Sequence, residues 1–274
     1  MKTGWPIGLL LVAALAIAGA GSTVGTGDLL ALGIDAWESS LAGAGLALGN
    51  PGAFNNPAAL AWSQGLKVSS TLGTAFGQVP ITAASLEASH LALGGVRLAS
   101  SENGADYLEE GGAAVLGLPL GGSLGLGLRL DVLHRSLPRE GLGWAVDAAV
   151  LYRGPFAAAG AVNAILARSP VPGEDWSSSF SLGLGFPLEL GEGIRAWVAA
   201  AAWGIGTPAA AGAIGAELRA GNLGARLGLS QDSLSLGILV AWGGFQLSLA
   251  AQLNPALSAC YRATLAIEFG RTSP

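Results

Sequence analysis

Apolar residues recur at every second position along much of the chain, and this period constrains the fold more than any other feature. In residues 122–134, leucine or valine occupies each alternate position from Leu124 to Val132. Small residues, Arg129 and Asp131 fall between them. Period two is typical of a β-strand with one apolar face and one polar or small face. The alternation recurs in residues 143–153, 209–220, 222–230, 232–243, 244–253 and 256–269.

The composition favours lipid as the surrounding solvent. Charged residues make up 11% of the 274 positions, 51% are hydrophobic, and the mean hydropathy is +0.54. An ordinary soluble domain carries about 25% charged residues. The net charge is −5 and no basic cluster is present, which argues against a nucleic-acid partner.

Membrane helices are the main alternative to strands. Residues 196–216 and 233–261 carry no charge, and their length alone would allow a helix to span a bilayer. Arginine placement favours strands, because an arginine facing lipid at mid-bilayer costs about 2–4 kcal/mol. Four arginines of the alternating segments fall on the small-residue face: Arg129, Arg219, Arg226 and Arg262.

We therefore predict an all-β fold, a transmembrane antiparallel β-barrel over residues 66–274, since closure satisfies every strand edge in lipid. Fourteen candidate segments are present, and twelve strands remain an alternative because residues 81–88 and the Gly243-Gly244 turn are ambiguous. The candidates lie near 66–76, 81–88, 90–99, 107–118, 122–134, 143–153, 156–167, 178–190, 193–205, 209–220, 222–230, 232–243, 244–253 and 256–269.

The N-terminus has the features of a cleavable signal peptide over residues 1–20. Lys2 precedes an apolar run from Ile7 to Ile17, and Ala18-Gly19-Ala20 supplies small residues at a cleavage site. The apolar run is shorter than the roughly 20 residues of a spanning helix, which argues against a membrane anchor. We expect export to a bacterial outer membrane.

Residues 21–65 are predicted to form a separate N-terminal segment, because residues 33–62 show no alternation. Pro51 and Pro57 interrupt regular structure there. The sequence predicts an irregular plug, followed by a short helix that begins near Pro57 with Asn56 as its N-cap.

Two stretches of this segment carry a family resemblance: Leu41-Ala42-Gly43-Ala44-Gly45, and Phe54-Asn55-Asn56-Pro57-Ala58-Ala59-Leu60. With the exported barrel they resemble the FadL-type outer-membrane barrels, and most closely the branch that includes the PorV and PorQ proteins of type IX secretion. Ala59 departs from the glycine usual there, and Asn50-Pro51-Gly52 stands where acidic residues are common.

The resemblance implies that the N-terminal segment folds inside the barrel as a hatch built on Asn55, Asn56, Pro57, Ala58 and Leu60. It implies membrane lipid as a partner. It also implies either a hydrophobic ligand, which enters from outside and leaves through a gap in the wall, or secreted cargo and secretion-system proteins. The alternative is a structural barrel with no transport role, which the short loops allow.

Charges on the small-residue face form a candidate lumen network, because charges inside a membrane span are expensive and should pair. We expect this network to pin the hatch, and a selectivity lining is the alternative. Glu109 and Glu110 are interpreted as a solvated rim, and Trp176 as part of an interfacial aromatic girdle. The network comprises Arg129, Asp131, Asp147, Glu217, Arg219, Arg226, Arg262 and Glu268.

No pattern indicates catalysis, a metal or another cofactor. His90 and His134 have no ligand-forming residue at metal spacing, and strand geometry puts Asp131 and His134 on opposite faces. Cys260 is the single cysteine, which excludes an intrachain disulfide and a multi-cysteine metal site.

Overall fold

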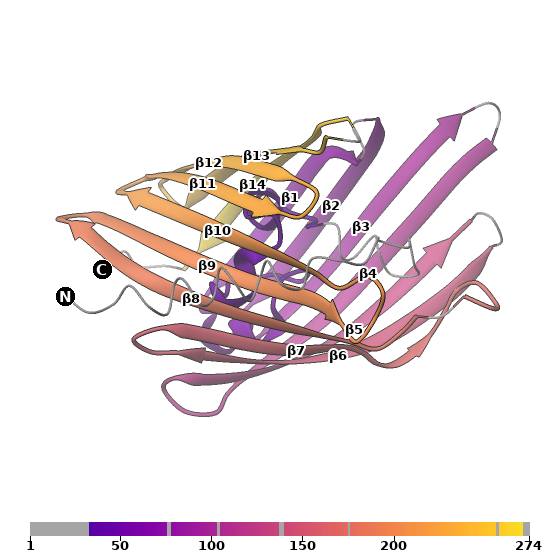
Figure 1. The fold of residues 1–274 in the computed structure, drawn as a ribbon, viewed down its shortest axis with the longest axis horizontal. Helices are drawn as coiled ribbons and strands as arrows, with labels where there is room; N and C mark the ends of the chain where they lie inside the picture. Colours follow the sequence, from indigo (N-terminus) through magenta and orange to yellow (C-terminus); the bar gives the residue numbers. More distant parts are fainter. Residues whose placement is uncertain are drawn as a thin grey trace.

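Fourteen antiparallel strands close into one barrel, in which each strand pairs with its neighbours in sequence and β1 pairs with β14 (Figure 1). The computed structural model describes residues 33–75, 78–102, 105–136, 140–174, 176–255 and 258–270. The predicted signal peptide lies outside these residues. The all-β barrel prediction is confirmed, with fourteen strands rather than twelve.

The strands run close to the predicted segments, and the two ambiguous places resolve as strand and turn. Residues near 81–88 form a full strand, and Gly243-Gly244 joins two separate strands. The strands are β1 Leu66–Ala75, β2 Val79–Ala88, β3 Leu91–Glu102, β4 Ala105–Pro119, β5 Leu124–Arg135, β6 Gly141–Arg153, β7 Ala157–Arg168, β8 Ser179–Gly191, β9 Ile194–Ile205, β10 Ala211–Ala220, β11 Leu223–Ser230, β12 Leu234–Trp242, β13 Phe245–Leu253 and β14 Cys260–Phe269.

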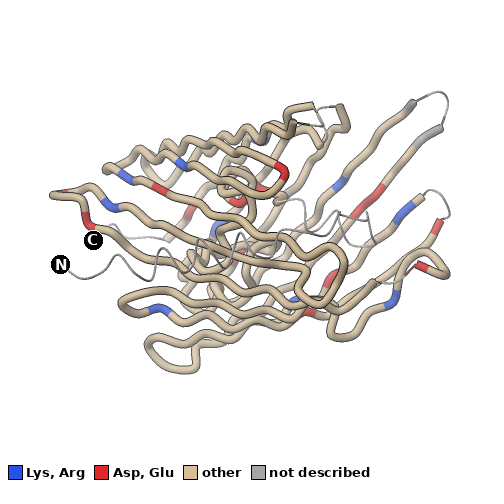
Figure 2. Tube along the Cα trace, viewed as in Figure 1, with Lys and Arg blue, Asp and Glu red and all other residues tan. Residues whose placement is uncertain are grey.

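Alternation along each strand separates an outer apolar face from an inner face. On β5, Leu128 and Leu130 are 42% and 46% exposed, whereas Asp131 and Leu133 are 2% and 0% exposed. The outward leucines of the other strands are exposed in the same way, which fits a surface solvated by lipid. Charged residues are sparse along the barrel wall (Figure 2).

The two ends of the barrel differ in the length of their connections. The end at which β1 begins and β14 ends has two-residue turns such as Ser89-His90 and Gly221-Asn222. At the other end, β7 and β8 are joined by residues 169–178, and β13 and β14 by residues 254–259. We call these the turn end and the loop end. The outward charges Arg97 and Glu110 form an ion pair towards the loop end.

In residues 33–65, three short helices precede the barrel: α3 (Ala36–Ser40), η1 (Ala44–Ala47) and η2 (Pro57–Trp62). None of the described helices is long and apolar enough to cross a membrane. As predicted, the last one begins at Pro57 and has Asn56 as its N-cap, although it is a 3₁₀-helix rather than an α-helix. Asn56 Oδ1 accepts a hydrogen bond from the Ala58 amide at 2.9 Å.

The helices lie against the inner wall of the barrel (Figure 1). Helix η2 packs on β4, β5 and β6, η1 packs on β7 to β10, and α3 packs on β11 to β14. Residues 33–65, which we call the N-terminal segment, therefore follow the wall around most of its circumference.

Candidate functional site in the lumen

Asn55, Asn56 and Asp35 give the N-terminal segment its internal structure. Asp35 caps helix α3, since its Oδ1 accepts from the Glu38 amide at 2.7 Å, and its Oδ2 accepts from Asn55 Nδ2 at 2.9 Å. Asn56 Nδ2 donates to the Leu46 carbonyl at 2.9 Å. The paired asparagines thus tie the loop before η2 to both α3 and η1.

Side chains of the wall hold the N-terminal segment from several strands. Thr264 of β14 accepts from the Ala36 amide at 2.9 Å, and Glu217 of β10 accepts from Trp37 Nε1 at 2.9 Å. Arg153 of β6 donates to the Gly49 carbonyl at 2.5 Å and lies over the Trp62 ring. Charges of the lumen therefore contact the N-terminal segment directly.

Inward glycines let the helices approach the wall backbone. A Cβ placed on Gly127 would lie 2.2 Å from the Pro57 carbonyl carbon, and one on Gly228 would lie 2.3 Å from that of Leu41. Real Cβ atoms do not approach so closely, so glycine is required for close packing at these two places.

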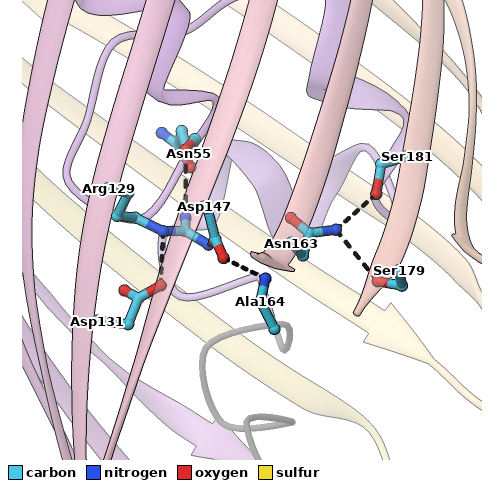
Figure 3. Close-up of polar contacts among 8 residues, drawn as sticks. All are labelled: Asn55, Arg129, Asp131, Asp147, Asn163, Ala164, Ser179 and Ser181. Carbon is cyan, nitrogen blue, oxygen red and sulfur yellow. Dashed lines mark hydrogen bonds and ion pairs between the residues drawn. The ribbon is translucent and has the colours of Figure 1, made fainter. Parts of the chain in front are cut away.

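Arg129 is the centre of the first charge group (Figure 3). Its guanidinium lies 2.9 Å from Asp131 Oδ2 and 2.5 Å from Asp147 Oδ2. It also donates to the Asn55 carbonyl at 3.5 Å, so the group reaches the predicted hatch motif.

Glu217 is the centre of a second group, in which it pairs with Arg219 and Arg226. The other two predicted lumen charges lie outside both groups. Arg262 donates to the Thr74 and Tyr261 carbonyls, and Glu268 accepts from Gln246 Nε2 at 2.9 Å. The predicted set is therefore divided into separate groups along the wall.

The wall is irregular between β6 and β7, at the Asp147 position. The register shifts between Val146 and Ala148, and Ala164 has a φ of 52°. Asp147 Oδ1 accepts from the Ala164 amide at 2.7 Å (Figure 3). Ser178 Oγ donates to the Ala164 carbonyl at 2.5 Å. Side chains thus replace the missing ladder hydrogen bonds and keep the wall closed.

An inward ion pair between β1 and β2 was missed in the sequence. Lys67 of β1 pairs with Glu87 of β2 at 3.1 Å; Glu87 is buried and Lys67 is partly buried. The sequence could have indicated that Lys67 points inward, because it alternates onto the same face as Ser69 and Thr71.

The interpretation of Glu109 as a solvated rim is wrong. Glu109 is 5% exposed, points inward and pairs with Arg135 at 3.1 Å, while Tyr107 donates to it at 2.6 Å. The cause is that β4 already begins at Ala105, so Glu109 lies well inside the strand, opposite Arg135. Glu110 points outward and is exposed, as predicted.

An apolar cluster fills the lumen near the loop end of β1 to β5. Phe54 of the N-terminal segment, Val79, Tyr107 and Trp176 pack against this cluster. The assignment of Trp176 to a membrane girdle is therefore wrong, because its connection folds it onto inward-facing residues. We call the following the luminal apolar cluster: Ile34, Ala75, Ile81, Ala83, Val96, Leu98 and Leu133.

A polar cavity lies beside this cluster, towards the turn end. Its volume is about 50 Å³, and its wall includes Asp35, Asn55, Lys67, Glu87 and Arg226. Each of Asn55, Glu87 and Arg226 has a buried polar atom with no hydrogen-bond partner among the described atoms. The cavity is large enough for a few water molecules and too small for a ligand, since ligand pockets measure roughly 300–1,000 Å³.

The carboxyl group of Glu38, on helix α3, lies where its charged form is disfavoured. Burial, and secondly the nearby Asp35, raise the pKa of Glu38 to about 8, although the Gly45 backbone amide opposes the shift. Among the described residues, no group of three His, Cys, Asp or Glu side chains could hold a metal ion.

The fold is shared with outer-membrane channels of known structure. A "CymD monoaromatic hydrocarbon channel" superposes with a TM-score of 0.59 at 12% identity, covering 88% of this chain and 99% of that one. A Pseudomonas aeruginosa FadL homologue gives 0.55 at 11% identity, covering 92% and 100%. The Acinetobacter baumannii outer membrane protein Omp33 gives 0.50 at 9%, covering 76% and 100%.

No protein-family model and no curated protein matches the sequence. At identities this low, the structural likeness shows a common barrel fold and leaves substrates and partners open.

Proposed function

We propose that this protein is an outer-membrane conduit for small hydrophobic molecules, and that the N-terminal segment is its hatch. The luminal apolar cluster carries the proposal. Ile81, Val96, Leu98 and Leu133 point into the lumen, where a barrel for hydrophilic solutes presents polar side chains. An apolar inner surface lowers the free energy of an apolar solute relative to water.

The outer membrane is the proposed location. The apolar outer belt and the even number of strands suit a bacterial outer-membrane barrel, and the predicted signal peptide supplies a route for export. Such barrels have short periplasmic turns and longer extracellular loops. The loop end, which carries the luminal apolar cluster, would then face the outside.

The hatch role is supported by how the N-terminal segment is held. Wall side chains from β6, β10 and β14 bond it, and the polar cavity left beside it has room for a few water molecules only. A channel for monoaromatic hydrocarbons and a FadL homologue share this fold, which supports the substrate class by analogy.

The secretion-associated PorV and PorQ branch is the alternative, and a purely structural barrel is another. A secretion role fits the closed wall, including the sealed irregularity at Ala164. It does not require apolar residues inside the lumen. The luminal apolar cluster therefore favours the conduit.

The test is uptake of a naphthalene-type fluorescent probe by Gram-negative cells that express the protein. Wild-type protein should speed uptake. Leu133→Gln should slow it about tenfold, because an uncompensated amide in an apolar site costs about 1–3 kcal/mol. Leu239→Gln is the matched control, since Leu239 is equally buried and inward but lies on β12 outside the cluster.

Equal uptake with and without the protein would contradict the conduit. In that case, co-purification of exported proteins with the barrel would favour the secretion alternative. The absence of both uptake and co-purified proteins would favour a structural barrel.

A further inference from the structure

The N-terminal segment meets the wall in two different ways. Its helices pack on β4 round to β14, whereas residues 51–54 of the loop Gly49–Asn55 lie against β1, β2 and β3. Lys67 of β1 donates to the Pro51 carbonyl, and a Cβ on Gly94 of β3 would lie 2.7 Å from both Ala53 and Phe54. This side of the lumen is therefore closed by a loop rather than by a helix.

The inner face of β1 to β3 changes from apolar to polar along the strand direction. Near the loop end, Ile81 pairs with Leu98, and one step further Ala83 pairs with Val96. Ser85 then pairs with Ser69, and at the turn end Glu87 pairs with Lys67. Apolar residues belong to the luminal apolar cluster, and the polar ones line the polar cavity.

Phe54 lies at the boundary between these two regions. It packs against the luminal apolar cluster and also lines the polar cavity. Its ring occupies the space over Gly94, which pairs with Ser85, so the ring lies at the level where apolar residues give way to polar ones. The missing side chain at Gly94 makes room for the ring.

Residues 51–55 of the loop, which include Phe54, are held to the wall by longer hydrogen bonds than helix α3. Lys67 reaches the Pro51 carbonyl at 3.4 Å, and Arg129 reaches the Asn55 carbonyl at 3.5 Å. The wall bonds of helix α3 measure 2.9 Å. Hydrogen bonds weaken beyond about 3.2 Å, so residues 51–55 are tied to the wall more weakly than helix α3 and more weakly than Gly49, whose carbonyl accepts from Arg153 at 2.5 Å.

We propose that passage through this barrel runs along the inner face of β1 to β3, and that Phe54 is the residue that closes it. Movement of the Phe54 ring off Gly94 joins the luminal apolar cluster to the polar cavity, while the three helices stay on the wall. The inference rests on the proposed conduit function, and it names where in the lumen that function is gated.

Thiol labelling tests the closure without knowledge of the substrate. Ser85→Cys, in a Cys260→Ser background, places a thiol on the polar side of Phe54. Intact cells are treated with a membrane-impermeant maleimide. Adding Phe54→Ala should raise the labelling rate about tenfold, the change expected when a partly buried aromatic anchor is lost from a two-state closure.

Leu46→Ala is the matched control. Leu46 is a partly buried apolar residue of the same segment, but it belongs to η1 and packs near Gly183 of β8. Its variant should label at the parent rate. Phe54→Leu should give an intermediate rate, which keeps the test usable if the alanine variant fails to show the heat-modifiable gel mobility of a folded barrel.

Equal labelling in the Phe54→Ala and Leu46→Ala variants would overturn the proposal, whether both rise or neither does, because the gate would then not be local to Phe54. Probe uptake by wild-type cells is scored separately. Absence of that uptake contradicts the conduit function, whereas the labelling ratio still decides whether Phe54 closes the path.

Discussion

The wall from β4 to β14 and the wall from β1 to β3 face the same N-terminal segment with different chemistry. Along β4, β5 and β11, glycines let the backbone of the N-terminal segment touch strand backbone. Along β1 to β3, side chains meet side chains: Phe54 packs against the luminal apolar cluster, which includes Ile81, Ala83, Val96 and Leu98. The first arrangement has few alternatives, because backbone packed on backbone cannot rotate away.

The difference teaches how one short segment can be both anchored and movable. Close-packed interiors resist small changes, whereas a flexible side chain can change rotamer at modest cost. We therefore assign anchoring to the helix-covered wall and gating to β1 to β3.

Removal of a lumen cation should give the largest difference in lost stability between the two sides. Arg129→Gln leaves Asp131 and Asp147 buried with no cation between them, and breaking a buried ion pair in this way costs about 3–5 kcal/mol. Lys67→Gln leaves only Glu87, which lines the polar cavity where water can solvate it. Its cost should be smaller. Thermal unfolding of the purified barrels in detergent measures both.

Arg97→Gln is the control for this pair of variants. Arg97 and Glu110 are 60% and 46% exposed, and exposed pairs contribute about 0–1 kcal/mol. Equal losses for Arg129→Gln and Lys67→Gln would contradict the assignment of anchoring to one side.

Glycine replacement should also destabilise the barrel unequally on the two sides, but the difference should be smaller than for the cation variants. Gly127→Val would push into the backbone of Pro57 and Ala58, whereas Gly94→Val would meet side chains, the Ala53 Cβ and the far end of the Phe54 ring. Overpacking costs about 1–3 kcal/mol, and we expect the upper end at Gly127. The measurement is again the unfolding temperature, combined with thiol labelling, which only Gly94→Val should increase.

Gly95→Val is the matched control, since an added Cβ there has only the Gly111 carbonyl oxygen nearby, at 4.0 Å, and faces outward. Destabilisation by Gly94→Val as large as that by Gly127→Val would show that the β1 to β3 side is packed as rigidly as the rest.

The barrel could be predicted from the sequence because period two is a local property. Leu124 to Val132 on one face and Arg129 on the other determine which side of a strand meets lipid, without knowledge of any partner strand. The helix start at Pro57 was also predictable, since an N-cap and a proline act within a few residues.

The lumen could not be predicted in the same way, because it depends on which residues meet across the barrel. Alternation gave no sign that Ile81 and Leu98 would face the lumen, or that Trp176, in a connection, would pack with them. The role of Glu109 depended on where β4 begins and on its register with Arg135. The packing of Trp176 and the role of Glu109 both depend on contacts between residues that are far apart in the sequence.

A rise in pH should weaken the anchoring of α3 on the helix-covered wall, so that the two sides hold the N-terminal segment more equally. This is the smallest effect we expect. Glu38 of α3 has a pKa near 8 in the folded barrel and an ordinary value of 4.5. Its contribution to stability is therefore complete below pH 4.5 and is lost as the pH rises towards 8, because the folded state must then carry a buried carboxylate beside Asp35. Partial exposure of Glu38 screens the loss.

The unfolding temperature of the wild-type barrel should fall between pH 5 and pH 9 by more than that of Glu38→Gln, whose amide stays neutral. The fall should be traceable to α3, so a spin label or fluorophore on that helix should gain mobility before one on η2 does. A pH profile unchanged by Glu38→Gln would assign the dependence to other groups and leave α3 as firmly anchored at pH 9 as at pH 5. In that case the helix-covered wall would hold the N-terminal segment over the whole range, and only the loop at Phe54 would remain free to move.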